Sequence, residues 1–283
     1  MENQYLIFTD LDGTLLDHHT YSFQPAVEML GKLKDANIPV IPNTSKTFAE
    51  LIFFRQQTKL DTPFIVENGA AVFIPIGFVK EQPAGTERFE RYWVKSFSKS
   101  REHWLSLLNT LPIELQNCYI GFSAMNNEQL CNETGLNAPA ALNANSRLYS
   151  EPLKWNGTDE QKQQIKTLLT DAGANVLQGG RFLHVSGHSD KGKAMLWLTE
   201  FLSSLVSATT KNTTYTTVAL GDSYNDNEML EVADIAVQIK SHKHDFPTLT
   251  RTANVVQSTQ FGPTGWTECL AKIIKFPKEL HHG

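Results

Sequence analysis

Short apolar runs alternate with amphipathic segments at both ends of the chain. Residues 5–8 are four consecutive apolar residues, and similar runs occupy residues 38–42, 217–221, 235–237 and 254–256. Continuous apolar runs are typical of parallel strands, which are buried on both faces. Apolar positions at helical spacing occur in residues 23–37, 48–59 and 190–205. The pattern predicts an α/β fold with a Rossmann-like parallel sheet.

The middle of the chain follows a different pattern. Asn68-Gly69, between two apolar runs, predicts a hairpin, and residues 77–85 resemble a linker in their glycine, proline and charge. Beyond this point we expect strands at 91–97, 118–123 and 147–155, helices at 99–111 and 158–172, and a hairpin within 175–185. These strands lack the acidic turns that follow the flanking ones. We therefore expect a core made of residues 1–84 and 188–283, with residues 85–187 inserted as an α+β cap domain.

Composition limits the kinds of partner. The 283 residues are 41% hydrophobic and carry a net charge of −5, so no basic surface indicates nucleic acid. Three widely spaced cysteines favour a reducing compartment and exclude a cysteine-based zinc cluster. No apolar run approaches the roughly 18 residues of a membrane helix, and no signal peptide is apparent. We expect a cytoplasmic protein without membrane partners; the sequence indicates no oligomeric state.

Polar groups follow four of the predicted strand or helix boundaries. They are Asp10 and Asp12, then Thr44 with Ser45 and Lys46, then Lys191, and finally Asp222 and Asp226. In open α/β sheets, ligands bind beyond the carboxyl ends of the strands, so these groups should converge. Neighbouring carboxylates repel unless a cation or a proton relieves them, and Mg²⁺ is commonly held by carboxylates and substrate phosphate. An ordinary Asp-Gly turn and a helix cap at residues 44–47 are the alternative explanations, although a cap and a phosphate site can coexist.

The same residues resemble the four motifs of the haloacid dehalogenase-like phosphatases, and the insertion matches their larger C2-type cap. The motifs are Asp10-Leu11-Asp12-Gly13-Thr14, Thr44, Lys191 and Gly221-Asp222-Ser223-Tyr224-Asn225-Asp226. The resemblance implies that Asp10 is the nucleophile, forming an aspartyl-phosphate, and that Asp12 is the general acid and base. It also implies phosphoryl contacts from Thr44 and Lys191, and support from Ser223 and Asn225. Mg²⁺ would be held by Asp10, the Asp12 backbone carbonyl and Asp222, with Asp226 supporting.

A narrower resemblance concerns the mannosyl-3-phosphoglycerate phosphatases. It rests on residues 42–47, 147–152, 179–182 and 262–266, although Ser45-Lys46 replaces the Gly-Arg more usual in related sugar phosphatases. It implies hydrolysis of mannosyl-3-phosphoglycerate, a phosphorylated glycoside, to the compatible solute mannosylglycerate. Guanidinium groups bind carboxylates bidentately, so Arg147 and Arg181 suit the glycerate carboxylate. The other candidates are Glu151 for sugar hydroxyls and Ser45 and Lys46 for the substrate.

Several alternatives stay open at this point. A glucosyl head group, a broad sugar-phosphate phosphatase and a phosphomutase are compatible with the same motifs. A non-catalytic protein that binds phosphorylated ligands is disfavoured by the intact Asp10, Asp12 and Asp222. Nucleotide binding is not supported, because no Walker-type loop or dinucleotide fingerprint is present.

Overall fold

The computed structural model describes residues 4–179, 181–207 and 215–276. Five parallel strands form the central sheet, in the order β13-β12-β11-β1-β2. Their bounds are β1 (Gln4–Thr9), β2 (Val40–Pro42), β11 (Tyr215–Gly221), β12 (Ile235–Lys240) and β13 (Val255–Phe261). In register, Ile7 lies opposite Val218 on one side and Val40 on the other. The predicted parallel sheet is confirmed.

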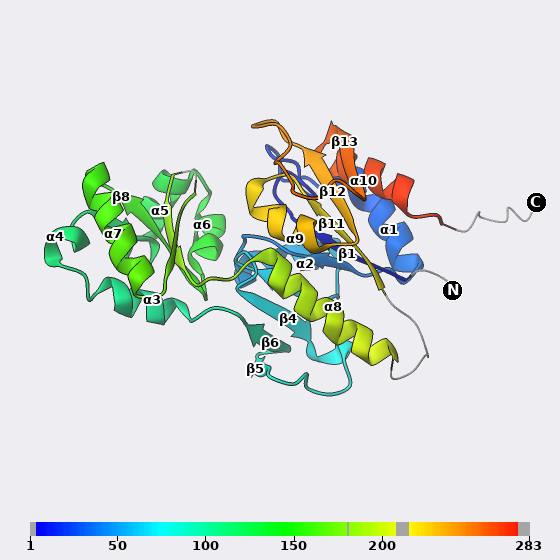
Figure 1. Cartoon of the computed structure of the whole chain (residues 1–283), viewed down its shortest axis with the longest axis horizontal. Helices are drawn as coiled ribbons and strands as arrows, with labels where there is room; N and C mark the ends of the chain where they lie inside the picture. The colour runs from blue at the N-terminus through cyan, green and yellow to red at the C-terminus, as the bar shows by residue number, and fades with distance from the viewer. Residues whose placement is uncertain (1–3, 180, 208–214, 277–283) are drawn as a thin grey trace, which may run out of the picture.

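Helices cover both faces of this sheet (Figure 1). Ile7 points to the face that packs on α1 (Val27–Asp35), α2 (Phe48–Thr58) and α10 (Gly262–Ile273). Its neighbours Leu6 and Phe8 point to the opposite face, covered by α8 (Lys191–Ser207) and α9 (Asn227–Val232). Alternate residues of a strand face opposite ways, so a strand between two helical layers must be apolar throughout.

A second, antiparallel sheet adjoins the first at β2. It has the order β3-β4-β6-β5, with bounds β3 (Phe64–Val66), β4 (Ala71–Pro75), β5 (Glu87–Phe89) and β6 (Tyr92–Ser96). A single parallel bridge between Asn43 and Ile65 joins it to the central sheet. The predicted hairpin connects β3 and β4. Because β6 pairs with β4, this sheet crosses the expected domain limit at residues 84 and 85, which stays a prediction.

The inserted region contains a third sheet, again antiparallel, with the order β7-β8-β10-β9. Its strands are β7 (Tyr119–Gly121), β8 (Ser150–Trp155), β9 (Asn175–Gln178) and β10 (Leu183–Ser186). Its helices are α3 (Arg101–Leu108), α4 (Ile113–Gln116), α5 (Asn127–Thr134), α6 (Ala138–Asn145) and α7 (Asp159–Asp171). One face of the sheet packs on α3 and α7 through Trp104, Leu153 and Ile165. The fold is therefore an α/β core with an inserted antiparallel cap.

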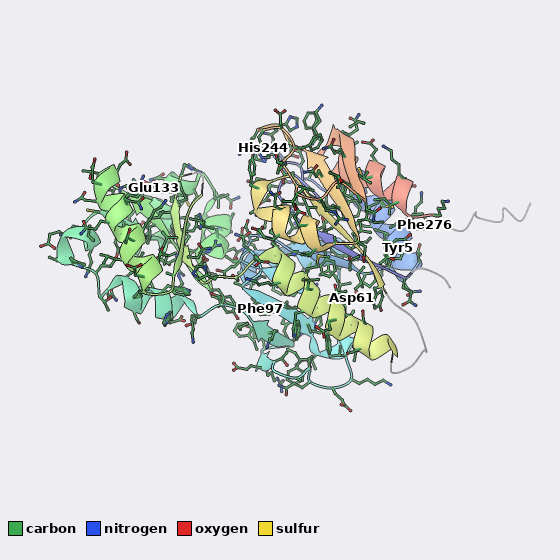
Figure 2. The ribbon with its side chains drawn as sticks, viewed as in Figure 1. Tyr5, Asp61, Phe97, Glu133, His244 and Phe276 are labelled. Carbon is green, nitrogen blue, oxygen red and sulfur yellow. The ribbon has the colours of Figure 1, made fainter. Side chains whose placement is uncertain are left out.

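The cap lies beside the core and is joined to it by two crossing segments, with Phe97 at the junction (Figure 2). The crossing segments meet where the Gly187 N–H donates to Ser98 Oγ over 3.2 Å. Helix α6 of the cap lies against α2 of the core, where Thr47 Oγ1 donates to the Asn143 carbonyl over 2.8 Å. The cap thus contacts the core next to the Thr44 loop.

Some local features differ from the sequence prediction. The expected helix at residues 23–37 is divided into a short helix, η1, and α1, and a further helix, α10, begins at Gly262. Trp266 is fully buried and donates to Thr9 Oγ1. The short helices are η1 (Gln24–Ala26), η2 (Ile76–Phe78), η3 (Phe122–Ala124) and η4 (Tyr224–Asp226). Within the described ranges, no helix has the length and apolar character needed to span a membrane.

Candidate functional site

Lys191 and two aspartates form the centre of the candidate site. The fully buried ammonium of Lys191, at the start of α8, lies 2.6 Å from Asp10 Oδ1 and 2.5 Å from Asp226 Oδ1. Asp10 follows β1, and Asp226 ends the short helix after β11. Buried charges are stable only when they are paired and hydrogen-bonded. Lys191 therefore holds two strand ends together and engages only Oδ1 of Asp10.

The local electrostatics leave an excess of negative charge. Burial raises the pKa of Asp10 to about 8; Lys191 opposes this, while the nearby Asp226, Asp222 and Asp12 add to it. Burial and Asp226 also raise the pKa of Asp222 to about 6, again against Lys191. Burial lowers the pKa of Lys191, but Asp10 and Asp226 outweigh it and the pKa rises. One lysine does not neutralise these carboxylates, so the site favours a further cation.

The carboxylates are arranged so that a divalent metal fits. One oxygen from each of Asp10, Asp222 and Asp226 lies within 4.8 Å of the others. Asp226 has both oxygens engaged, since Oδ1 faces Lys191 and Oδ2 accepts from the N–H groups of Asp222 and Ser223 at 3.0 Å. Asp10 and Asp222 are therefore the carboxylates better placed to bind a metal directly, with Asp226 orienting the Asp222 loop. Hard oxygen donors of this kind suit Mg²⁺.

Gly13 is required by the close approach of the two acidic loops. Its φ of +79° is in the left-handed region, and a Cβ there would lie 2.5 Å from Asp222 Oδ2. Beside it, Thr14 Oγ1 contacts Asp222 Oδ1 at 3.4 Å. The Asp-Gly turn therefore does more than reverse the chain, because it admits the carboxylate that follows β11.

The Thr44 loop combines a helix cap with polar groups that the cap does not use. Thr47 caps α2 in a reciprocal capping box with Glu50, so Thr44, Ser45 and Lys46 are not needed for capping. Lys46 Nζ lies 2.8 Å from Asp12 Oδ2. Burial lowers the pKa of Lys46, but Asp12 and Glu50 outweigh it and the pKa is raised. The other oxygen, Asp12 Oδ1, is buried without a hydrogen-bond partner among the described residues, which suits a group that must exchange a proton with a ligand.

The tip of the β3–β4 hairpin, residues 67–69, contacts the Thr44 loop, the Asp222–Asp226 loop and the chain just before α8. Its three residues all have positive φ, 47°, 56° and 85°. The N–H groups of Glu67 and Asn68 donate to the carbonyls of Lys46 and Thr44, and Asn68 Oδ1 accepts from Asn225 over 3.0 Å. A Cβ on Gly69 would lie 2.0 Å from the Asp190 carbonyl. The Asn-Gly pair predicted only a hairpin here and gave no indication of these contacts.

The cap residues predicted to bind substrate are not brought together. Arg147 lies at the boundary with the core, where its NH2 group donates to the Ser45 carbonyl over 3.1 Å. Glu151 is fully buried inside the cap, bound to Arg101 at 2.5 Å and to Ser123. Arg181 donates to the Thr134 carbonyl over 2.6 Å. Of the three, only Arg147 contacts the Thr44 loop. Glu151 fits a structural role, which the sequence did not indicate because its partner, Arg101, lies far away in the chain.

His184 is a further cap residue at this boundary. On β10 it lies opposite Pro152, and Ser186 lies opposite Ser150, so His184, Ser186 and Ser150 share one face of the cap sheet. Burial, and then the charge of Arg147, lower the pKa of His184 to about 4. A neutral imidazole therefore lies on the same face as Ser150.

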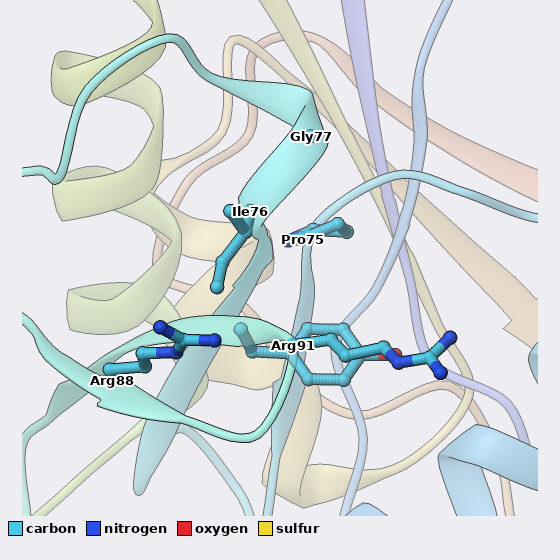
Figure 3. A pocket seen from close by; sticks show the side chains of 6 residues that line it. Pro75, Ile76, Gly77, Arg88 and Arg91 are labelled. Atoms are coloured by element: carbon cyan, nitrogen blue, oxygen red, sulfur yellow. The ribbon is translucent and has the colours of Figure 1, made fainter.

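Two depressions lie outside the site. One, of about 470 Å³, is lined by Pro75, Ile76, Gly77, Arg88, Arg91 and Tyr92 (Figure 3). The other, of about 600 Å³, includes Ile38, Pro39 and Val40 at the start of β2. Ligands of open α/β sheets bind at the opposite, carboxyl ends of the strands. Neither depression competes with the aspartate site.

Comparisons with known proteins agree with this geometry. The model of the haloacid dehalogenase-like hydrolase family matches residues 7–248. A glucosyl-3-phosphoglycerate/mannosyl-3-phosphoglycerate phosphatase from Methanococcoides burtonii is 35% identical over 273 residues, which cover 96% of this chain and 97% of that protein. A solved structure from Geobacillus kaustophilus is 17% identical with a TM-score of 0.66, covering 96% of this chain and 99% of that chain. One from Thermotoga maritima is 16% identical with a TM-score of 0.66, covering 96% and 98%.

Proposed function

Because the chain belongs to the haloacid dehalogenase-like hydrolases and is a phosphatase, we propose that it hydrolyses mannosyl-3-phosphoglycerate to mannosylglycerate and inorganic phosphate. The observation that carries the chemistry is Lys191 buried between Asp10 and Asp226, with Asp222 within reach of both carboxylates. The substrate is supported by the relative that covers nearly the whole chain.

The reaction divides between Asp10 and Asp12. Asp10 Oδ2 attacks phosphorus while the bond to the glycerate oxygen breaks, giving an aspartyl-phosphate. Asp12, through its unpartnered Oδ1, gives a proton to the departing oxygen and then takes one from the water that hydrolyses the intermediate. Thr44 and Lys191 contact the phosphoryl oxygens. Mg²⁺, held by Asp10, Asp222 and the Asp12 carbonyl, would neutralise charge on the phosphoryl group.

The cap supplies selectivity in this proposal. Arg147 extends from the cap to the Thr44 loop, so its guanidinium lies within reach of a carboxylate attached to the reacting phosphate ester. Lys46, next to Asp12, adds positive charge within the same loop. Glu151 and Arg181, already engaged inside the cap, have no direct part. A glucosyl head group is the second candidate, because the relative's name includes both glycosides.

A substrate panel tests the proposal. Phosphate release would be measured from mannosyl-3-phosphoglycerate, glucosyl-3-phosphoglycerate, glucose 6-phosphate and 3-phosphoglycerate, with Mg²⁺ and with EDTA. We expect kcat/KM for at least one glycosyl-3-phosphoglycerate to exceed that of glucose 6-phosphate by about 100-fold, since a lost charged contact is typically worth tenfold or more. 3-Phosphoglycerate keeps the carboxylate and lacks only the sugar, so its kcat/KM should fall less. Equal turnover of glucose 6-phosphate would instead identify a broad sugar-phosphate phosphatase.

A further inference from the structure

Glu67 at the tip of the β3–β4 hairpin is a buried carboxylate outside the four motifs. Its side chain is 1% exposed, and its φ of 47° places a non-glycine residue in the left-handed region. Such a backbone is retained only where the surrounding contacts compensate for it. The hairpin turn by itself does not require a buried carboxylate at this position.

Both oxygens of Glu67 bind one short segment of the cap. Oε1 accepts from the Leu148 N–H over 2.7 Å. Oε2 accepts from the Ser150 hydroxyl over 2.6 Å and the Tyr149 N–H over 3.3 Å, and lies 3.5 Å from Arg147 Nε. Every donor comes from residues 147–150, the segment that leads into β8. A single core side chain thus fixes the backbone and the arginine of the cap segment that faces the site.

The hairpin tip that carries Glu67 is itself attached to the catalytic loops. The N–H groups of Glu67 and Asn68 bind the carbonyls of Lys46 and Thr44. Arg147 of the cap also links the two core segments, because it contacts both Glu67 and the Ser45 carbonyl. The position of the cap segment is therefore linked through Glu67 to the loop that is expected to hold phosphate.

We propose that Glu67 is a positioning residue, which docks cap residues 147–150 on the core and so holds Arg147 beside the Thr44 loop for a phosphorylated substrate with a second anionic group. This role rests on the proposed function, because it concerns the substrate of that site. Glu67 does not touch the phosphorus and takes no part in the chemical step. Its loss should weaken recognition of a large substrate and leave the reaction of a small one intact.

Glu67→Gln is the informative substitution. It keeps the shape, but its amide NH2 would face a donor of residues 148–150 in either orientation. Glu67→Asp keeps the charge with a shorter reach and should restore part of the function. Glu90→Gln is the matched control, because Glu90 also has a left-handed φ, 51°, yet is exposed and its carboxylate is in no hydrogen bond or ion pair with the described residues.

Kinetics with two substrates test the positioning role. For mannosyl-3-phosphoglycerate, we expect Glu67→Gln to raise KM about 10- to 100-fold, the effect of losing charged hydrogen bonds, with kcat less affected. For p-nitrophenyl phosphate, which has no second anionic group, kcat and KM should stay within about twofold of wild type. Glu90→Gln should match wild type on both. Equal losses on both substrates, or unchanged KM for the glycoside, would overturn the role.

Hydrogen exchange tests the docking without any substrate. The amides of Leu148 and Tyr149 should exchange about tenfold faster in Glu67→Gln, because their acceptor is impaired, while the amide of Leu169 in α7 should not change. Unchanged exchange at Leu148 and Tyr149 would overturn the docking. If wild type hydrolyses p-nitrophenyl phosphate but neither glycosyl-3-phosphoglycerate, the proposed substrate is wrong, and the exchange result still decides whether Glu67 docks the cap.

Discussion

Replacing Lys191 with methionine tests the electrostatic centre of the site. Methionine has a similar length, so Lys191→Met removes the charge and leaves most of the packing. The ammonium is fully buried and paired at 2.6 Å and 2.5 Å with Asp10 and Asp226. Removing one partner of a buried ion pair typically costs about 3–5 kcal/mol, since the remaining charge is left unpaired. We expect a loss of that size in the free energy of unfolding, together with loss of phosphatase activity.

The assay is urea unfolding near neutral pH in EDTA, with a double-substitution cycle. Asp226→Asn is made in wild type and in the Lys191→Met background. Asp226→Asn should lower the free energy of unfolding by about 1–3 kcal/mol less in the Lys191→Met background than in wild type, because the carboxylate it removes there is already unpaired. Lys193→Met is the control on the same helix: its exposed pair with Asp190 at 3.1 Å should be worth less than about 1 kcal/mol. Additive effects of Lys191→Met and Asp226→Asn, or equal losses of stability for the two lysine substitutions, would show that Lys191 is not held in a buried ion pair with Asp226.

Two other substitutions test separate parts of the account. Gly13→Ala combines a Cβ 2.5 Å from Asp222 Oδ2 with a φ of +79°, so it should lower the free energy of unfolding by about 1–3 kcal/mol. Gly31→Ala is the control, because nothing lies within 4 Å of its Cβ, and it should be neutral or stabilising. Similar effects of the two substitutions in thermal unfolding would contradict the close approach of Gly13 to Asp222. The pKa of His184 is lowered to about 4 in the folded protein, so the unfolded chain binds more protons below the ordinary value of 6.5 and stability is lost as the pH falls between these values. His184→Gln should remove up to about 3 kcal/mol of that loss, measured by urea unfolding at neutral pH and near pH 4; an unchanged pH dependence would show that His184 is not buried as a neutral ring.

The parallel sheet and its acidic loops could be predicted because each depends on residues adjacent in sequence. The apolar run before Asp10 specifies a strand buried on both faces, and the strand direction places Asp10 and Asp222 at the same edge. Helix α2 begins where its cap residue, Thr47, occurs. The motif residues thus carry local signals, which the fold converts into proximity.

The cap contacts could not be predicted, because they join residues far apart in the chain. Glu67 binds residues about 80 positions later, and Arg101 binds Glu151 about 50 positions later. On charge alone, Arg147 could have paired with Glu151 as well as Arg101. Helices α5 and α6 were also missed, since each has eight residues and shows little amphipathic repetition between its asparagine cap and its end.

Phosphate transfer by Asp10 is the step on which the proposed function depends. The most direct test is the initial rate of inorganic phosphate release from mannosyl-3-phosphoglycerate with Mg²⁺, for wild type and Asp10→Asn at equal concentrations of folded protein. Asparagine has almost the same shape but is not a carboxylate nucleophile, so the rate should fall by about 1,000-fold or more. A rate for Asp10→Asn within about tenfold of wild type would contradict the assignment of Asp10 as the nucleophile.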